Sequence, residues 1–344
     1  MHRRASPLVE PSVTGRNLMS IASFRAPAFS AAPCVEDFGN GCFAYLQPNG
    51  SWGFSNAGLV TDGGEALLVD TFFDKAHTQK MLAGFSRASR AAGNIRTLVN
   101  THQNGDHWVG NALVECAEII ATERAAAGMQ HENPQLLAAI MAAAPHMGQT
   151  GEFLTHCFSP FNFQHGEVRL PDTVFSGRTE RVVGSKHVEL VEVGPAHTGG
   201  DAIVHVPADR TVFTGDILFV DGHPIMWDGP SANWIAACDM ILGLDVETIV
   251  PGHGPVTDKG GVRRVRDYLV YIRDEARKRF DAGLPALEAA RDISLSDYES
   301  WGDAERIAAN VAALYREFGA TDVPSDAQVM FEWMAKLWQE RRSR

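Results

Sequence analysis

The sequence predicts an α+β fold with a helical insertion and a helical C-terminal extension. Strand patterns dominate residues 38–70, and strand and helix patterns then alternate as far as residue 120. Strand patterns return over residues 172–250, and apolar residues recur at helical spacing beyond residue 260. A chain of 344 residues can bury a large core and still carry an appendage. We therefore predict an N-terminal arm at residues 1–32, a main domain at residues 33–260 with an insertion at residues 122–165, and an extension at residues 261–344.

The first half of the main domain alternates between strand and helix signals. Asn49-Gly50 and Asp62-Gly63-Gly64 are turn signals between apolar runs, and the first of them favours a hairpin. A helix is expected over residues 75–92, and a shorter one over residues 109–116. The expected strands are residues 42–46, 55–60, 66–70, 95–100 and 119–120.

The insertion breaks this alternation. Asn133-Pro134 has the form of a helix cap followed by proline at the first helical position, which predicts a helix over residues 136–144. An aromatic loop is expected to follow, and it holds Phe153, Phe158, Phe161 and Phe163. Two interpretations of this loop are open: core beneath the insertion, or a lid that forms one wall of a substrate site.

The second half of the main domain predicts further strands, and the extension predicts helices. Strands are expected at residues 181–183, 188–193, 202–206, 211–213 and 248–250. In the extension, helical apolar stripes run over residues 262–280, 307–318 and 330–338, and they are interpreted as packing faces. Gly319 is expected to end the second of these helices, and Ser325 with Gln328 forms a capping box before the third. The extension should pack on the main domain or make a homodimer contact.

Composition restricts the partners and the compartment. A formal net charge of −12 argues against nucleic acid or an anionic membrane as a partner, because both attract a basic face. The five cysteines are scattered without a CxxC pair, which favours a reducing compartment and a cytoplasmic protein. No stretch of about 18 apolar residues predicts a transmembrane helix. The arm shows no sustained apolar segment typical of a secretory signal; we expect it to be poorly ordered or to strap over a neighbouring subunit, and Met19 is an alternative start.

The run from Thr101 to His107 is the strongest chemical signal in the chain. It follows a buried strand and places four candidate metal ligands within six residues: His102, Asn104, Asp106 and His107. A helix cannot turn all four toward one point, whereas a loop built on the Asn104-Gly105 turn can. Imidazole and carboxylate groups at such spacing are typical ligands of zinc, iron and manganese.

Three later segments offer complementary ligands. His197, Asp216 and His253 each stand on a glycine-rich turn at the end of an apolar strand. Glycine allows backbone conformations that aim a short side chain inward, and loops on a rigid sheet are where sites are usually built. A single histidine or aspartate at such a turn is usually structural. Four such segments in one chain indicate a metal site.

This pattern resembles the metallo-β-lactamase-fold hydrolase superfamily, whose central His-x-His-x-Asp-His motif is followed by single His, Asp and His residues. The resemblance runs from about Phe38 to Asp258. It implies a four-layer αββα sandwich and two divalent metal ions, with zinc expected and manganese or iron as alternatives. Asp70 matches a strand-end aspartate that supports the metal loop. The resemblance implies one metal site with His102 and His197, a second with Asp106, His107 and His253, and Asp216 as the bridge between them.

The sequence departs from the motif at Asn104, which stands where the family has its second histidine. An amide oxygen is a weaker donor than imidazole. Asn104 could bind through its oxygen, the site with His102 and His197 could be weakly occupied, or its preference could shift from zinc toward manganese or iron. Alternatively, Asn104-Gly105 only makes the turn.

The implied function is metal-dependent hydrolysis of a small-molecule substrate. A bridging hydroxide would attack a carbonyl group, and Asp106 or Asp216 would orient it and accept its proton as catalytic residues. His223 is interpreted either as a donor to the leaving group or as a surface residue, and Trp227 either as a pocket wall or as core. The loop over residues 221–227, Trp234 and the phenylalanine-rich insertion suggest an apolar cleft, and hence a hydrophobic or aromatic ester, lactone or thioester.

Other functions remain open at this point. A glyoxalase-II-like thioesterase would use Arg263, Arg264 and Arg266 to receive a glutathione carboxylate, unless these arginines form a solvated helix face. The reduced ligand set at Asn104 keeps open a mononuclear iron oxygenase of the same superfamily. A binding or scaffold protein without activity is the third alternative, and the number of candidate ligands argues against it.

Overall fold

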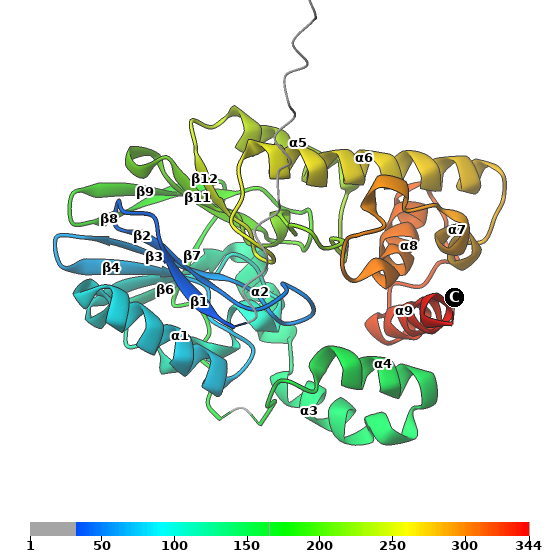
Figure 1. Ribbon diagram of the computed structural model, residues 1–344, viewed down its shortest axis with the longest axis horizontal. Coiled ribbons are helices and arrows are strands. Elements are labelled where there is room, and N and C mark those ends of the chain that lie inside the picture. Colours follow the sequence, from blue (N-terminus) through cyan, green and yellow to red (C-terminus); the bar gives the residue numbers. More distant parts are fainter. Residues whose placement is uncertain (1–31, 165, 344) are drawn as a thin grey trace, which may run out of the picture.

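The computed structural model describes residues 32–164 and 166–343. Two β-sheets lie face to face, and helices cover the outer face of each (Figure 1). The α+β class and the four-layer αββα arrangement are therefore confirmed. The predicted N-terminal arm lies outside the described residues apart from Ala32.

Within the described residues, the first sheet has seven strands in chain order. Strands β1 to β4 pair antiparallel, whereas β4, β5, β6 and β7 pair parallel. Because β4 and β5 are parallel neighbours, the residues that follow them, Asp70 and Asn100, emerge at the same edge of the sheet. The strands are β1 (Cys34–Asp37), β2 (Cys42–Leu46), β3 (Ala57–Asp62), β4 (Glu65–Val69), β5 (Ile95–Val99), β6 (Glu118–Thr122) and β7 (Thr173–Phe175).

In the part of the chain that the structure describes, the second sheet has five strands in the order β12-β11-β10-β9-β8. Only β11 and β12 pair parallel, and helix α5 (Ser231–Gly243) lies between them in the chain. The turns after β11 and β12 therefore leave the sheet at the same edge, with Asp216 on one and His253 on the other. The strands are β8 (Arg178–Val183), β9 (Lys186–Glu192), β10 (Ala202–Val206), β11 (Thr211–Phe213) and β12 (Thr248–Val250).

Apolar side chains fill the spaces between the layers. Between the sheets, Leu67 and Val99 of the first pack in one cluster with Val204 and Phe213 of the second. Helix α1 (Lys75–Ala88) covers the outer face of the first sheet, and α5 with α6 (Lys259–Asp281) covers that of the second (Figure 1). The Asp74 side chain caps α1 by accepting a hydrogen bond from a backbone N–H of its first turn.

The insertion between β6 and β7 consists of helices α2 (Glu123–His131), α3 (Pro134–Ala143) and α4 (Gly148–Phe158). The side chain of Asn133 caps α3, as expected from the sequence. The prediction of an aromatic loop was partly wrong, because Phe153 and Phe158 lie on α4 and are buried there. The helix was not predicted because its apolar side packs on distant residues, Trp52 of the main domain and Phe331 of the extension.

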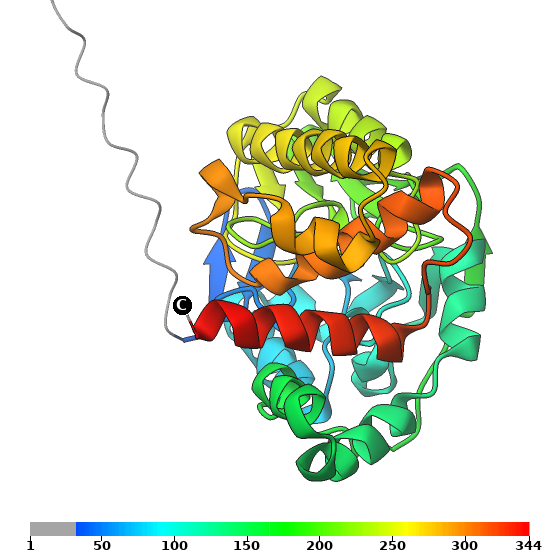
Figure 2. The ribbon, with the colours of Figure 1, turned by 90° about the vertical axis from the view of Figure 1, so that its right-hand side faces the viewer.

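The C-terminal extension contains α6, α7 (Ala286–Asp292), α8 (Ile307–Glu317) and α9 (Ala327–Arg342). Helix α9 lies alongside α4 (Figure 2), with the ring centroids of Phe153 and Trp338 5.6 Å apart. The predicted capping box was wrong: the cap of α9 is Asp326, which accepts from the backbone N–H groups of Gln328 and Val329. The insertion and the extension therefore contact each other beside the sandwich.

Some elements differ from their predicted form. Asn49-Gly50 lies in a ten-residue connection between β2 and β3, over residues 47–56, rather than in a tight hairpin. Strand β1 and helices α5 and α7 have no counterpart among the predicted elements. Among the helices of the described residues, none has the length and apolar character needed to cross a membrane.

Candidate metal centre

Turns from both sheets bring the predicted ligands together. His102, Asn104, Asp106 and His107 follow β5, His197 follows β9, Asp216 lies in a 3-10 turn after β11, and His253 follows β12. The turns approach so closely that a Cβ atom on Gly252 would lie 2.0 Å from Oδ1 of Asp216. Glycine is therefore required at position 252 for Asp216 to reach the centre.

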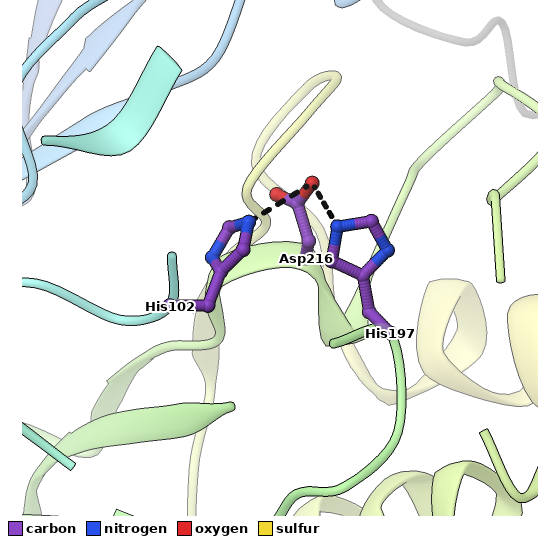
Figure 3. Close-up of side chains that lie close together, drawn as sticks. All are labelled: His102, His197 and Asp216. Atoms are coloured by element: carbon purple, nitrogen blue, oxygen red, sulfur yellow. Dashed lines mark ion pairs between the residues drawn. The ribbon is translucent and has the colours of Figure 1, made fainter. Parts of the chain in front are cut away.

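His102, His197 and Asp216 form a first group. Oδ2 of Asp216 lies 3.6 Å from Nε2 of His102 and 3.3 Å from Nε2 of His197 (Figure 3). Ligands of one zinc ion, with bonds of about 2 Å, stand at roughly this separation. The three side chains are buried and could hold one cation.

Asp106, His107 and His253 form a second group. Oδ2 of Asp106 lies 3.4 Å from Nε2 of His253 and 3.9 Å from Nε2 of His107. Asp216 also reaches this group, with Oδ1 at 3.1 Å from Nε2 of His107 and Oδ2 at 3.4 Å from Nε2 of His253. The carboxylate of Asp216 thus lies within reach of both groups.

The four imidazoles are oriented in the same way. Each has its Nδ1 atom hydrogen-bonded outside the centre and its Nε2 atom directed inward. The outer partners are Oγ1 of Thr101 for His102, Oδ2 of Asp70 for His107, the carbonyl of Ile225 for His197 and the carbonyl of Gly50 for His253. Fixing one ring nitrogen in this way leaves the other free to bind a metal.

Several inward-facing atoms have no partner of their own. Nε2 of His102 is buried without a hydrogen bond, and Nε2 of His107 and Oδ1 of Asp216 are buried with only their mutual contact of 3.1 Å. Within the described residues, no lysine or arginine forms an ion pair with Asp106 or Asp216. Buried carboxylates without a cation are costly, so bound divalent ions would satisfy both the charges and the orphaned atoms. The residues present therefore fit a metal centre.

Burial and charge act in opposite directions on the ionisation of the centre. Burial raises the pKa of Asp216, but the neighbouring His253 and His107 outweigh it and hold that pKa well below its usual range. Burial, reinforced by His107, lowers the pKa of His102 well below its ordinary value. Burial also lowers the pKa of His197, which favours the neutral, metal-binding imidazole.

Asn104 faces the first group. Its Oδ1 atom lies 2.7 Å from Nε2 of His197, and the side chain makes no capping bond to the 3-10 turn that follows it. Glu132, a residue that the sequence gave no reason to select, lines the same cavity as Asn104. Burial raises the pKa of Glu132 to about 8, against the hydrogen bond that it accepts from Trp108.

A cavity of about 410 Å³ opens onto the centre. The candidate metal ligands form its polar end, whereas the remaining walls are mainly aromatic and aliphatic. The insertion supplies Leu136, Leu137, Ile140 and Phe158, the extension supplies Phe331, and Trp52, Phe73, Phe219 and Trp227 complete the apolar lining. The buried guanidinium of Arg306 also lines it, 4.3 Å from the ring centroid of Trp52. The insertion therefore contributes both to the core and to the wall of the cavity.

The remaining residues that the sequence analysis singled out differ in their position relative to the cavity. Trp227 lines the cavity, but Trp234 is core and donates to the carbonyl of Ile217. Both interpretations of His223 were wrong, because it is fully buried, does not line the cavity, and contacts the carbonyl of Tyr298 through Nε2. Its loop turns the ring toward the extension. The arginines of α6 also lie outside the cavity lining: Arg263 is exposed, Arg264 pairs with Asp221, and Arg266 pairs with Asp239.

Comparison with known proteins places this centre in a family. A model of the metallo-beta-lactamase superfamily matches residues 50–253. A segment of 88 residues is 33% identical to 2,4-dinitroanisole O-demethylase subunit alpha from Nocardioides sp. (strain JS1661), covering 25% of this chain and 27% of that subunit.

Two solved structures share the fold. The stereoselective inverting sec-alkylsulfatase Pisa1 from Pseudomonas sp. gives a TM-score of 0.61 at 15% identity, with 86% of this chain and 51% of that chain covered. A metallo-beta-lactamase from Pontibacter korlensis gives a TM-score of 0.50 at 18% identity, with 69% of this chain and 99% of that chain covered. The chain thus spans about half of the alkylsulfatase. The family model matches more than half of the chain and contains every candidate ligand, and the chain therefore belongs to the metallo-β-lactamase superfamily.

Proposed function

We propose that this protein is a metal-dependent hydrolase that cleaves an ester, lactone or thioester of a hydrophobic or aromatic small molecule. One observation carries the proposal: the two ligand groups stand at one end of a cavity whose other walls are mainly apolar. Such a cavity binds the apolar part of a substrate and directs its polar bond toward the reactive end. The proposal includes two divalent cations, with zinc as the expected metal.

The side chains of the centre have separable tasks. The first group would hold one cation and the second group another, with Asp216 shared between them. Bound divalent cations supply Lewis-acid polarisation of a carbonyl group and lower the pKa of water. Asp106 lines the cavity, where its carboxylate would orient a water molecule and take up its proton. Asp216, with its strongly lowered pKa, would stay ionised throughout.

The substrate class follows from the cavity and is consistent with the comparisons. A volume of about 410 Å³ suits a small organic molecule. The names of the sec-alkylsulfatase and the 2,4-dinitroanisole O-demethylase subunit both indicate substrates in which an alkyl or aryl group is bonded to oxygen. Alkyl sulfates and aryl methyl ethers therefore belong beside esters, lactones and thioesters in a substrate panel.

The test combines metal content with hydrolysis. Wild type, Asp216→Ala and the control Asp245→Ala, which alters an exposed carboxylate, would be analysed by elemental mass spectrometry and assayed on the panel. We expect about two cations per chain in wild type and the control, fewer in Asp216→Ala, and hydrolysis that chelation abolishes. One iron per chain with oxygen consumption would instead support the oxygenase alternative, and a wild type without metal or activity would refute the proposal.

A further inference from the structure

The loop between β11 and α5 connects one candidate metal ligand to the C-terminal extension. The carbonyl oxygen of Ile225 in this loop lies 2.6 Å from Nδ1 of His197. A carbonyl oxygen only accepts, so Nδ1 carries the proton, and Nε2 of the neutral ring presents its lone pair to the first group. The direction of the Ile225 carbonyl therefore fixes where Nε2 of His197 points.

The peptide group that carries this carbonyl is held from its opposite side. The carbonyl of Ile225 and the N–H of Met226 belong to one planar trans peptide group, so they point in opposite directions. The N–H of Met226 donates to Oδ1 of Asn310 at 2.7 Å. A rotation of this peptide group that turned the carbonyl away from His197 would therefore also break the bond to Asn310.

The orientation of the Asn310 side chain is determined by its backbone partners. Asn310 lies on α8 of the extension and is buried, with 1% of its surface exposed. Its Nδ2 atom donates to the carbonyl of Pro224 at 2.9 Å. Because Met226 offers a donor and Pro224 an acceptor, only one orientation of the amide satisfies both. Asn310 thus holds the peptide groups on both sides of Ile225.

The extension also holds the preceding part of the same loop. The backbone N–H of His223 donates to the carbonyl of Gly302 at 2.9 Å. The buried guanidinium of Arg306 donates to the carbonyl of His223, also at 2.9 Å. Consecutive peptide groups of the loop, up to the one that orients His197, are therefore hydrogen-bonded to the extension.

We infer that Asn310 is a positioning residue for the metal centre: through the peptide group between Ile225 and Met226, it directs Nε2 of His197 into the first group. This rests on the proposed function, because it concerns the binding of a metal ion by that group. Removal of a partner that orients a metal ligand typically lowers metal affinity by about 10–100-fold. The extension is then a part of the metal centre as well as a packing layer beside the sandwich.

Metal affinity tests this role without reference to activity. Metal-free wild type, Asn310→Ala and Asn310→Asp would be titrated with Zn²⁺ in competition with a chromophoric chelator. Aspartate keeps an oxygen that accepts from the N–H of Met226 in either protonation state, whereas alanine has none. We expect Asn310→Ala to weaken one of the two binding steps by about 10–100-fold, and Asn310→Asp to restore most of that loss.

Two controls separate positioning from a general structural effect. Tyr315→Phe removes another hydrogen bond from α8 to a backbone carbonyl, that of Leu284, and should leave both binding steps unchanged. Adding Asn310→Ala to His253→Ala should weaken the remaining step, because Nδ1 of His253 contacts the carbonyl of Gly50 and the first group is left intact. Adding Asn310→Ala to His197→Ala should leave the remaining step unchanged.

Three results would overturn the inference. They are an Asn310→Ala protein that binds both ions as wild type does, an Asn310→Asp protein that loses as much affinity as Asn310→Ala, and a His197 ring that carries its proton on Nε2. The last is read from ¹H–¹⁵N NMR of metal-free wild type and Asn310→Asp, and it decides the matter if Asn310→Ala does not fold. A wild type that binds no metal would refute the proposed function itself, so the two failures are distinguishable.

Discussion

Oδ2 of Asp70 lies 2.9 Å from Nδ1 of His107, so a carboxylate that belongs to neither ligand group orients a ring of the second group. The same carboxylate accepts from the backbone N–H and from the hydroxyl of Thr101, each at 2.7 Å. Asp70 has a left-handed backbone with φ of 62°. It therefore links the end of β4 to the start of the metal loop.

Asp70→Asn should weaken metal binding in the second group without disturbing the fold. Asparagine tolerates the left-handed backbone, but one accepting oxygen becomes a donor. We expect about a 10–100-fold lower Zn²⁺ affinity for one binding step. The matched control is Asp221→Asn, which also has a left-handed backbone, with φ of 60°, but pairs with Arg264 outside the centre. Equal affinities in the two variants would show that Asp70 does not support His107.

Arg306→Met should destabilise the protein strongly. The buried guanidinium donates to the carbonyl of His223 at 2.9 Å and pairs with Asp303 at 3.0 Å. Removing one partner of a buried ion pair typically costs about 3–5 kcal/mol. Urea denaturation would measure the free energy of unfolding. Arg277→Met, which removes an exposed pair with Asp281, should cost less than about 1 kcal/mol, and similar losses in the two variants would contradict this account.

Phe331→Ala should change substrate binding more than stability. The ring is half-buried on α9 and lines the cavity. We expect KM to rise for bulky hydrophobic substrates while kcat changes little, because the lost contact is the same in the ground and transition states. Phe153→Ala is the comparison, since Phe153 is fully buried and should lose about 3–5 kcal/mol of stability. If Phe331→Ala and wild type have the same KM for every substrate in a series of acyl chain lengths, Phe331 does not contact the substrate.

The burial of His223 predicts acid sensitivity. Burial first, and then the charge of Arg306, lowers the pKa of His223 to about 3. The unfolded chain takes up this proton below about pH 6.5, whereas the folded chain does not, so stability is lost as pH falls from about 6.5 toward 3. This contribution approaches about 1.4 kcal/mol per pH unit. Denaturation at pH 6.5 and 5.5 should show a smaller loss for His223→Gln than for wild type, whereas His187→Gln, at an exposed histidine, should behave like wild type.

The convergence of the candidate ligands was predictable because their chemistry and their position are both local. Each turn that carries a ligand directly follows an apolar strand, and strands β5, β11 and β12 lie in parallel pairs within the two sheets. Their carboxyl ends therefore meet where the sequence places His102, Asp216 and His253. Whether these residues bind a cation remains a prediction, and titration of the protein with metal would test it.

Residues whose surroundings depend on tertiary contacts could not be identified from the local sequence. Glu132 ends an insertion helix, and only the fold brings it to Trp108. Arg306 stands in the extension, far in sequence from Trp52, whose ring it faces. Local chemistry was also ambiguous at the start of α9, where neighbouring Ser325 and Asp326 are both good caps and the backbone selects the second.

Each ligand group takes residues from both sheets: His102 of the first group and Asp106 and His107 of the second follow β5, whereas His197, Asp216 and His253 follow strands of the other sheet. A cation bound in either group would thus join the two halves of the sandwich, and its binding free energy would add to that of folding. By mass action, a free metal concentration one hundred times the dissociation constant adds about 2.7 kcal/mol per site. The lifetime of the folded chain in a cell would then rise and fall with the supply of its metal, so a metal-starved cell would lose the protein itself as well as its activity.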